Sequence, residues 1–413
     1  MFDFKKVANE TKWTHAMLRP ESFLFAAILT GLVALGPIST DMYLPSLPAL
    51  KAELGASVSQ VQLTLSVFLG GFAISQLFYG PLSDRFGRRP VLIFGITIYC
   101  LASIACFLST TIEGLILARF FQAFGACSGP VLGRAIVRDV YGQERAAQML
   151  AYIGSAMALA PAVAPLIGGY LQIWYGWQAN FMVISLFALI LIILVVMLIQ
   201  ETNPHINPEA LQVRRIFGNY LELFRHREYM GYVLLNSFIF SGLFAFISGS
   251  SFVFIDVFGL TPDLYGICFG ICVGGFITGT LIAGKLSRKL GSLLMLRYGS
   301  LLSLVSGALL ASVALGGGVG PVSVVAPMFV FMVSVGIVMP NSMAGAIGPF
   351  PKMAGAASAM MGFLQMAIAA SVGVSVGLLD NGTQMPMVLA IAAMGALTFV
   401  SYVVFIHAKT CSD

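Results

Sequence analysis

Two ionisable side chains, Asp41 and Arg119, stand inside long apolar stretches of the sequence. A charge at bilayer depth costs about 3 kcal/mol, so residues of this kind usually line a pathway or pair with one another. Burial favours the neutral carboxylic acid and a nearby cation favours the carboxylate, so a carboxyl group under both influences can load and release a proton. We interpret Asp41 as a proton carrier that Arg119 tunes or helps to relay. The alternative is a static ion pair that holds two helices together.

A second group of charges lies in a short segment, GPLSDRFGRR, from Gly80 to Arg89. Its charged residues are Asp84, Arg85, Arg88 and Arg89. The simplest interpretation is a solvated loop. Gly80 and Gly87 are expected to permit a tight turn and the close approach of other groups.

The same pattern returns from Gly284 onward, GKLSRKLG, at an offset of 204 residues. Four positions of the two segments are identical: Gly80/Gly284, Leu82/Leu286, Ser83/Ser287 and Gly87/Gly291. Arg288 replaces Asp84 in the second copy. Only the first copy therefore has a carboxylate at this position that could contact another part of the protein.

The elements that carry these residues have the composition of a protein that faces lipid. Hydrophobic residues make up 58% of the 413 residues and charged residues 9%, whereas roughly 25% of a soluble domain is charged. Mean hydropathy is +0.93. Lipid offers no partner for backbone polar groups, so each span must be a helix of about 20 residues. Twelve segments qualify: 22–48, 58–80, 90–110, 112–133, 146–172, 178–200, 229–255, 263–284, 293–315, 321–347, 354–379 and 386–407.

The distribution of basic residues supports this count. With both termini in the cytoplasm, 20 of the 22 Lys and Arg residues fall in cytoplasmic segments, the side that favours them. Only Lys51 falls outside, and only Arg119 lies within the membrane. Asp41 and Arg119 then both lie about 10–12 Å below the outer end of their helices, at 1.5 Å per residue.

The repeat offset is close to half the chain length, so we expect two six-helix bundles in the same orientation. The predicted parts are a tail (1–21), a first bundle (22–200), a linker (201–228), a second bundle (229–407) and a tail (408–413). Transporters built from such repeats place the substrate between the halves.

Several segments resemble a known family. The segment from Gly80 to Arg89 resembles the signature G-x-L-[SA]-D-R-x-G-R-[RK] of the major facilitator superfamily. Residues 119–125 (RFFQAFG) and 164–169 (APLIGG) resemble the R-x-x-Q-G-x-G and G-P-x-x-G-G motifs of its drug:proton antiporters, with one Ala for Gly in each. Residues 39–48 (STDMYLPSLP), together with FISGS at 246–250 and GPFPKMAGAASA at 348–359, are similar to the bicyclomycin-resistance (Bcr/CflA) subfamily.

The resemblance implies an all-α major facilitator fold of twelve spans in a bacterial cytoplasmic membrane. It implies export of small amphipathic antibiotics, such as bicyclomycin-like or phenicol-like compounds, in exchange for protons. It also implies that Asp84 contacts a helix N-terminus of the opposite half, near Ala354, and so latches an outward-open state. The residues Pro161, Pro165, Gly168 and Gly169 would form a hinge or seal between the halves, although simple helix packing explains them equally well.

The walls of the expected cavity are assigned from polar and aromatic residues inside the spans: Tyr43, Gln122, Asn236, Phe240, Phe244, Asn341 and Gln365. A wide apolar site with few polar groups would accept varied drugs. For each aromatic residue alone, plain packing is the commoner explanation.

Other classes of function remain open or are disfavoured. A proton symporter or facilitator that imports a nutrient is the first alternative, and a membrane receptor or assembly factor is the second. An enzyme is disfavoured because no His lies deep in a span and no P-loop is present. We expect a monomer with no cofactor beyond the coupling proton and no nucleic-acid partner. We expect no metal site, because Cys268 and Cys272 have no further ligands nearby.

Overall fold

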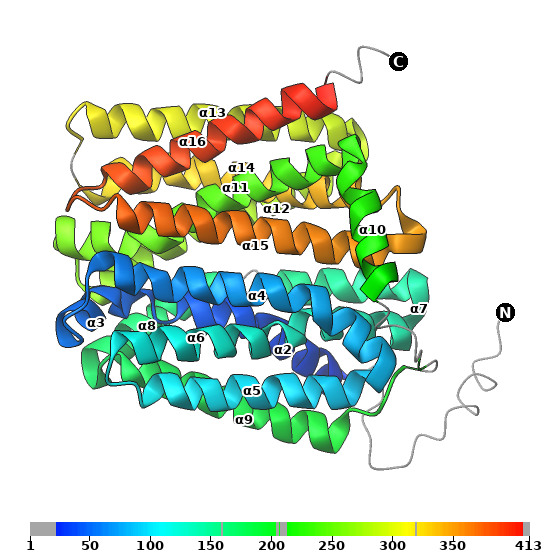
Figure 1. Ribbon diagram of the computed structural model, residues 1–413. Coiled ribbons are helices and arrows are strands. Elements are labelled where there is room, and N and C mark those ends of the chain that lie inside the picture. Colours follow the sequence, from blue (N-terminus) through cyan, green and yellow to red (C-terminus); the bar gives the residue numbers. More distant parts are fainter. Residues whose placement is uncertain (1–21, 158–159, 204–205, 207–212, 319, 408–413) are drawn as a thin grey trace.

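The computed structural model of the protein is a bundle of helices (Figure 1). It describes residues 22–407 except 158–159, 204–205, 207–212 and 319. The predicted tails at 1–21 and 408–413 lie outside the described residues, as does part of the predicted linker. Over the described part, every regular element is a helix, which confirms the predicted all-α membrane fold.

In the described residues, the first half of the chain forms nine helical elements. They are α2 (Phe23–Asp41), η1 (Leu44–Ser46), α3 (Leu47–Glu53), α4 (Val58–Phe86), α5 (Arg88–Phe107), α6 (Ile112–Ala126), α7 (Ser128–Met157), α8 (Ala160–Tyr175) and α9 (Gln178–Leu198). The second half begins with the helix α10. Its elements are α10 (Val213–Arg225), α11 (Arg227–Ser251), η2 (Phe252–Val257), α12 (Pro262–Leu290), α13 (Ser292–Leu315), α14 (Pro321–Ile347), η3 (Pro351–Met353), α15 (Ala354–Leu378), α16 (Met385–Ser401) and η4 (Tyr402–His407).

Within the described residues, eleven helical runs are long and apolar enough to cross a membrane. They coincide with eleven of the twelve predicted spans. The remaining prediction, 146–172, corresponds to the end of α7 and to α8, and residues 158–159 between them are not described.

Two predicted boundaries are wrong. The predicted spans 112–133 and 146–172 leave 134–145 as a loop, which holds Arg134, Arg138 and Arg145, but this segment is helical because α7 runs through it from Ser128 to Met157. The first span does not continue as one α-helix to residue 48, because α2 ends at Asp41 and a short 3-10 helix, Leu44–Ser46, follows with Pro45 in its first turn. Asp41 is therefore the last residue of its helix.

The sequence repeat is also a structural repeat. Helices α4 and α12 have the same length, 29 residues, and begin and end 204 positions apart. Each ends at a glycine with positive φ, 96° at Gly87 and 83° at Gly291, and a new helix starts one residue later. Glycine adopts this backbone region without steric cost, so both copies form the same sharp corner.

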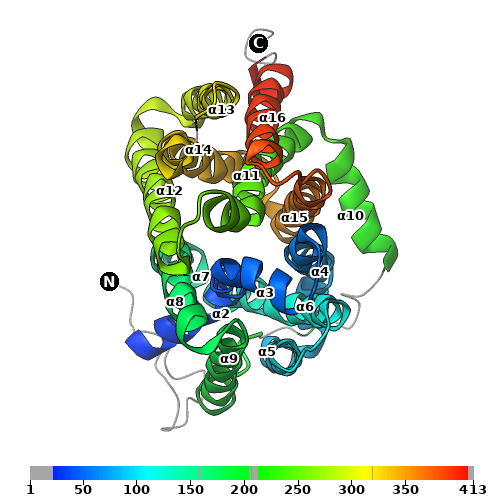
Figure 2. The same cartoon turned by 90° about the vertical axis from the view of Figure 1, so that its left-hand side faces the viewer.

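The two halves lie side by side, with α4 packed against α15 and α8 against α12 (Figure 2). Helix α10 crosses one end of the bundle, which we call the linker end, and α3 lies at the opposite end, which we call the α3 end (Figure 1). At the α3 end, polar contacts join the halves. The Oγ of Ser251 donates to the Leu44 carbonyl (2.5 Å), and Gln62 donates through Nε2 to the Ser248 carbonyl (3.0 Å).

At the linker end the halves are separated by a cavity of about 460 Å³. Its walls come from both halves and from α10, and include Asp84, Arg138, Tyr220 and Ala354. The bundle is therefore closed at the α3 end and open at the linker end.

Candidate functional site

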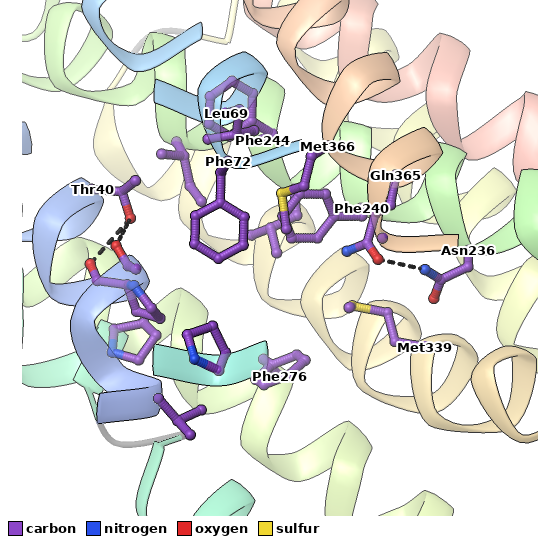
Figure 3. A pocket seen from close by; sticks show the side chains of 18 of the residues that line it. Thr40, Leu69, Phe72, Asn236, Phe240, Phe244, Phe276, Met339, Gln365 and Met366 are labelled. Atoms are coloured by element: carbon purple, nitrogen blue, oxygen red, sulfur yellow. Dashed lines mark hydrogen bonds between the residues drawn. The ribbon is translucent and has the colours of Figure 1, made fainter. Parts of the chain in front are cut away.

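A central cavity of about 480 Å³ lies between the halves (Figure 3). Ligand-binding cavities commonly have 300–1,000 Å³ and mostly apolar walls. Here the walls are mainly Phe, Met, Leu and Val side chains, with Asp41, Arg134 and a few amides. The central and linker-end cavities share three residues, Gln76, Arg134 and Ser358, so a molecule can approach the centre from the linker end.

Asp41 lies at the wall of this cavity. Its side chain is 3% exposed, and Thr40 donates a hydrogen bond through Oγ1 to its Oδ1 at 2.9 Å. No other carboxylate lines the cavity in the described part of the chain. The C-terminal end of α2 thus places one carboxyl group in a mainly apolar chamber.

Arg119 does not join Asp41 in the cavity. It is fully buried within the first half, where Nη1 donates to the Ser39 carbonyl (2.9 Å) and to Oε1 of Gln122 (2.5 Å). Its guanidinium carbon lies 4.6 Å from the ring centroid of Tyr43 and 4.3 Å from that of Phe68. The rings and acceptors stabilise the buried cation. No ion pair between Asp41 and Arg119 occurs among the described residues.

The predicted cavity residues divide into two groups. Asn236, Phe240, Phe244 and Gln365 line the cavity, as predicted, and Asn236 donates through Nδ2 to Oε1 of Gln365 at 2.8 Å (Figure 3). The Oδ1 of Asn236 accepts a hydrogen bond from Ser342 at 3.0 Å. This amide pair therefore presents a fixed polar spot on the second half.

The other three assignments are wrong, because their polar groups are satisfied away from the cavity. Tyr43 hydrogen-bonds Thr64 (2.5 Å), Gln122 donates to Ser103 (2.9 Å) and accepts from Arg119, and Asn341 donates to the carbonyl of Ile337 in its own helix (2.8 Å). None of the three lines the cavity.

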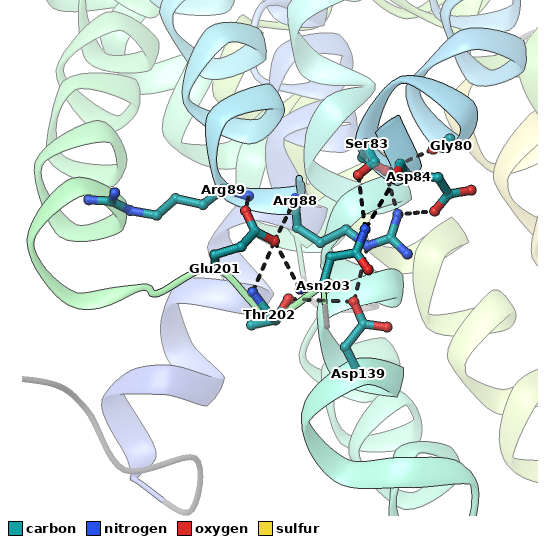
Figure 4. Close-up of polar contacts among 9 residues, drawn as sticks. All are labelled: Gly80, Ser83, Asp84, Arg88, Arg89, Asp139, Glu201, Thr202 and Asn203. Atoms are coloured by element: carbon teal, nitrogen blue, oxygen red, sulfur yellow. Dashed lines mark hydrogen bonds and ion pairs between the residues drawn. The ribbon is translucent and has the colours of Figure 1, made fainter. Parts of the chain in front are cut away.

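The charged corner between α4 and α5 is held by a network that the sequence only partly predicted (Figure 4). Arg88 is at its centre. Nη1 of Arg88 lies 2.5 Å from Oδ1 of Asp84 and 2.6 Å from Oγ of Ser83, and its Nε lies 3.0 Å from Oδ2 of Asp139. Asp84 is therefore paired within its own half, although it lines the linker-end cavity together with Ala354. The predicted contact of Asp84 with a helix N-terminus is not made in this conformation.

Glu201 is the residue of this network that sequence reasoning missed. Its carboxylate accepts from the backbone N–H groups of Arg88 (2.8 Å) and Arg89 (3.1 Å), which are unpaired donors at the start of α5. A carboxylate at a helix N-terminus is also favoured by the helix dipole. One sequence feature could have pointed to Glu201. It is an acidic residue directly after the sixth span, on the side of the membrane that carries most of the basic residues.

The two glycines of the corner differ. Gly87 has φ 96°, and a Cβ there would collide with Oε2 of Glu201, so both the turn and the contact require glycine. Gly80 lies inside α4, and a Cβ there would meet nothing within 4 Å. The prediction of a tight turn or close approach at Gly80 is wrong. The remaining basic residues lie outward: Arg85 is exposed, and Nη2 of Arg89 donates to the Val196 carbonyl at 2.7 Å.

The motif residues of the fifth span lie in α8 and face two partners. A Cβ at Gly168 would overlap the carbonyl oxygen of Met42, just after Asp41, whereas one at Gly169 would lie 2.6 Å from the carbonyl oxygen of Pro262 in the other half. Pro165 is buried inside the helix, and Pro161 lines the central cavity. The motif therefore packs α8 tightly both against the end of α2 and across the interface between the halves.

Arg134 is a cavity residue that the sequence interpretation treated as part of a loop. Because α7 is continuous, Arg134 and Arg138 lie one turn apart on it, and Arg134 reaches both cavities. Within the described residues, no cluster of three or more His, Cys, Asp or Glu side chains could hold a metal ion.

Comparison with known proteins agrees with this geometry. Residues 26–374 match the sequence model of the Major Facilitator Superfamily. A bicyclomycin resistance protein homolog of Haemophilus influenzae is 33% identical over 92% of this chain and 96% of its own length. A chloramphenicol resistance protein of Pseudomonas aeruginosa is 30% identical over 86% of this chain and 84% of its own. The crystal structure of a D-xylose-proton symporter has the same fold, with a TM-score of 0.73 at 15% identity over 93% of this chain and 98% of that one.

Proposed function

The chain belongs to the major facilitator superfamily, and from that premise we propose that it exports small amphipathic drugs in exchange for protons. It is a multi-span membrane transporter and not an enzyme. The names of its relatives direct attention to bicyclomycin-like and phenicol-like antibiotics. The largely apolar cavity, with one amide pair and few charges, supports a substrate class of this kind.

We place the linker end in the cytoplasm of a bacterium and the α3 end outside its cytoplasmic membrane. Arg88, Arg134 and Arg138 all line the linker-end cavity, whereas Lys51 lies at the α3 end. Cytoplasmic segments carry the excess of Lys and Arg, which supports this orientation.

Proton coupling in this proposal belongs to Asp41, and the observation that carries it is the isolation of this carboxyl group in the cavity wall. A buried carboxylate gains a partner from a bound proton or from a donor group of the substrate, such as a hydroxyl, an amide N–H or an ammonium, but not from both at once. Access from the outside would load the proton, and access from the cytoplasm would release it. Substrate and proton would then occupy the site in turn.

The conformation of the protein corresponds to the inward-open step of this cycle. The hydrogen bond between the halves at the α3 end is formed, and Asp84 is paired with Arg88 at the open linker end. When the linker end closes, Asp84 and the start of α15 at Ala354 would approach each other across the same cavity, and the predicted latch would form.

Proteoliposomes under an imposed pH gradient test the proposal. With purified protein in one known orientation, chloramphenicol should move against the inward flow of protons, and reversal of the gradient should reverse its direction. Co-movement of drug and proton would support the symporter alternative. Drug transport whose rate and direction do not change with the pH gradient would exclude coupling to protons.

A further inference from the structure

Among the described residues, Arg134 is the cationic side chain of the central cavity, and no described carboxylate pairs with it. Its Nε donates to the carbonyl of Pro130, four residues earlier in α7, at 2.9 Å. Across the described residues its guanidinium makes no other hydrogen bond and no ion pair. The two Nη groups are therefore free to bind something in the cavity.

Two other arginines show how this chain otherwise stabilises such a group. Aromatic rings cover Arg119 and its Nη1 has two acceptors, although its Nε and Nη2 have no hydrogen-bond partner among the described residues, and Arg88 bonds two carboxylates. A guanidinium fully removed from water without a partner is unfavourable by several kcal/mol, and Arg134, which is half-buried, bears part of this cost. Arg134 borders apolar walls and is oriented by Pro130, yet its donors lack a protein acceptor. An anionic group on a ligand would supply one.

Arg134 and Asp41 lie at different levels of the cavity. Next to Arg134, a Cβ on Gly133 would lie 3.3 Å from Cγ2 of Val33, so this part of α7 is level with Val33 of α2. Asp41 comes eight residues later in α2, which is about 12 Å further along a helix that rises 1.5 Å per residue. Apolar side chains such as Leu69 and Phe72 also line the cavity (Figure 3). The cavity thus has a cationic end, apolar walls and an acidic end.

We propose that this cavity selects amphoteric aromatic molecules, with a carboxylate bound by the guanidinium of Arg134 and an amine directed toward Asp41. The inference rests on the proposed export function and names its preferred substrate class. The planar guanidinium presents parallel N–H donors that fit a carboxylate in a bidentate manner. Protonation of Asp41 would then release the amine.

Three matched probes test the proposal on the purified full-length protein. They are 4′-(aminomethyl)biphenyl-4-carboxylic acid, its carboxamide, which lacks the acid, and 4′-methylbiphenyl-4-carboxylic acid, which lacks the amine. Calorimetry should show that the wild type binds the amphoteric probe about tenfold more tightly than the carboxamide, the gain expected for a charged hydrogen bond. The substitution Arg134→Gln should reduce this preference to about twofold or less, and Arg134→Lys should leave an intermediate preference.

Arg138→Gln is the matched control, because Arg138 lies one turn away on α7 and lines only the linker-end cavity. It should keep the wild-type preference. The proposal is overturned if the wild type binds acid and amide equally, if Arg134→Gln and Arg134→Lys both keep the full preference, or if Arg138→Gln abolishes it equally. Chloramphenicol transport by the wild type under a pH gradient tests the export function separately. An acid preference without gradient-driven transport would contradict that function and leave the binding site standing.

Discussion

Lys51 of α3 and Asp256 of η2 form an ion pair between the two halves, with 3.6 Å between Nζ and Oδ2. The pair lies at the closed end of the bundle, near the hydrogen bond from Ser251 to the Leu44 carbonyl. Both side chains are about two-fifths exposed, 39% and 40%, so solvent screens their attraction. In an alternating-access cycle, these contacts must break when the outer side opens.

The first prediction concerns this pair. Lys51→Gln should shift the conformational equilibrium toward the outward-open state, but by less than about fivefold, since exposed ion pairs contribute about 0–1 kcal/mol. Spin-label distances across the α3 end would measure the shift. The exchanged pair Lys51→Asp with Asp256→Lys should restore the wild-type distribution. Equal distances in all variants would show that the ion pair plays no part in closure.

The second prediction concerns the interface between α8 and α12. Gly169→Val should allow membrane insertion but abolish transport, because the new side chain would collide with the carbonyl of Pro262 and separate the halves. Gly70→Ala is the control, since a Cβ there meets nothing within 4 Å and Gly70 lines neither cavity. Drug accumulation in an efflux-deficient host would report both. Full activity of Gly169→Val would contradict the packing described for this interface.

The third prediction separates the two glycines of the charged corner. Gly87→Ala should destabilise the folded protein by about 1–3 kcal/mol, the cost of a strained backbone, in addition to its clash with Glu201. Gly80→Ala should leave the melting temperature in detergent nearly unchanged or slightly raised, because alanine favours a helix. If both variants melted at the same temperature, the positive φ at Gly87 would have no energetic role.

The fourth prediction assigns Arg119 to position the end of α2 rather than to carry protons. Arg119→Gln should lower the free energy of unfolding by about 2–4 kcal/mol, through loss of the cation–π contacts and of charged hydrogen bonds. Any folded fraction should still respond to a pH gradient. Thermal melting and proteoliposome transport would measure the two effects. A stable Arg119→Gln protein that has lost only its gradient response would support the relay interpretation instead.

Hydropathy, basic-residue counts and the repeat at Gly80 and Gly284 were sufficient to predict the helical membrane architecture. These signals report depth and orientation, which depend on composition along one helix. They do not report rotation about the helix axis. Asp41 and Arg119 were placed at a similar depth, but Arg119 turns into the core of the first half, and Phe68 is both its ring partner and a cavity residue.

The same limitation explains the errors in the cavity. Polar residues inside spans were assumed to face the substrate, yet Gln122 and Asn341 are satisfied by neighbours within their own half. Glu201 acts on α5 across 113 residues of sequence, a contact that no local pattern reports. Arg134 was not assigned to the cavity, because a basic stretch between two predicted spans was taken to be a loop.

The fifth prediction is the most direct test of the proposed role of Asp41 in proton coupling. Asp41→Asn keeps the size of the side chain and an oxygen that can accept from Thr40, but it cannot bind or release a proton at neutral pH. In proteoliposomes the variant should therefore exchange labelled chloramphenicol across the membrane at equal drug concentrations. It should fail to accumulate the drug when a pH gradient is imposed, whereas the wild type should do both. Accumulation by Asp41→Asn at the wild-type level under the same gradient would contradict the account.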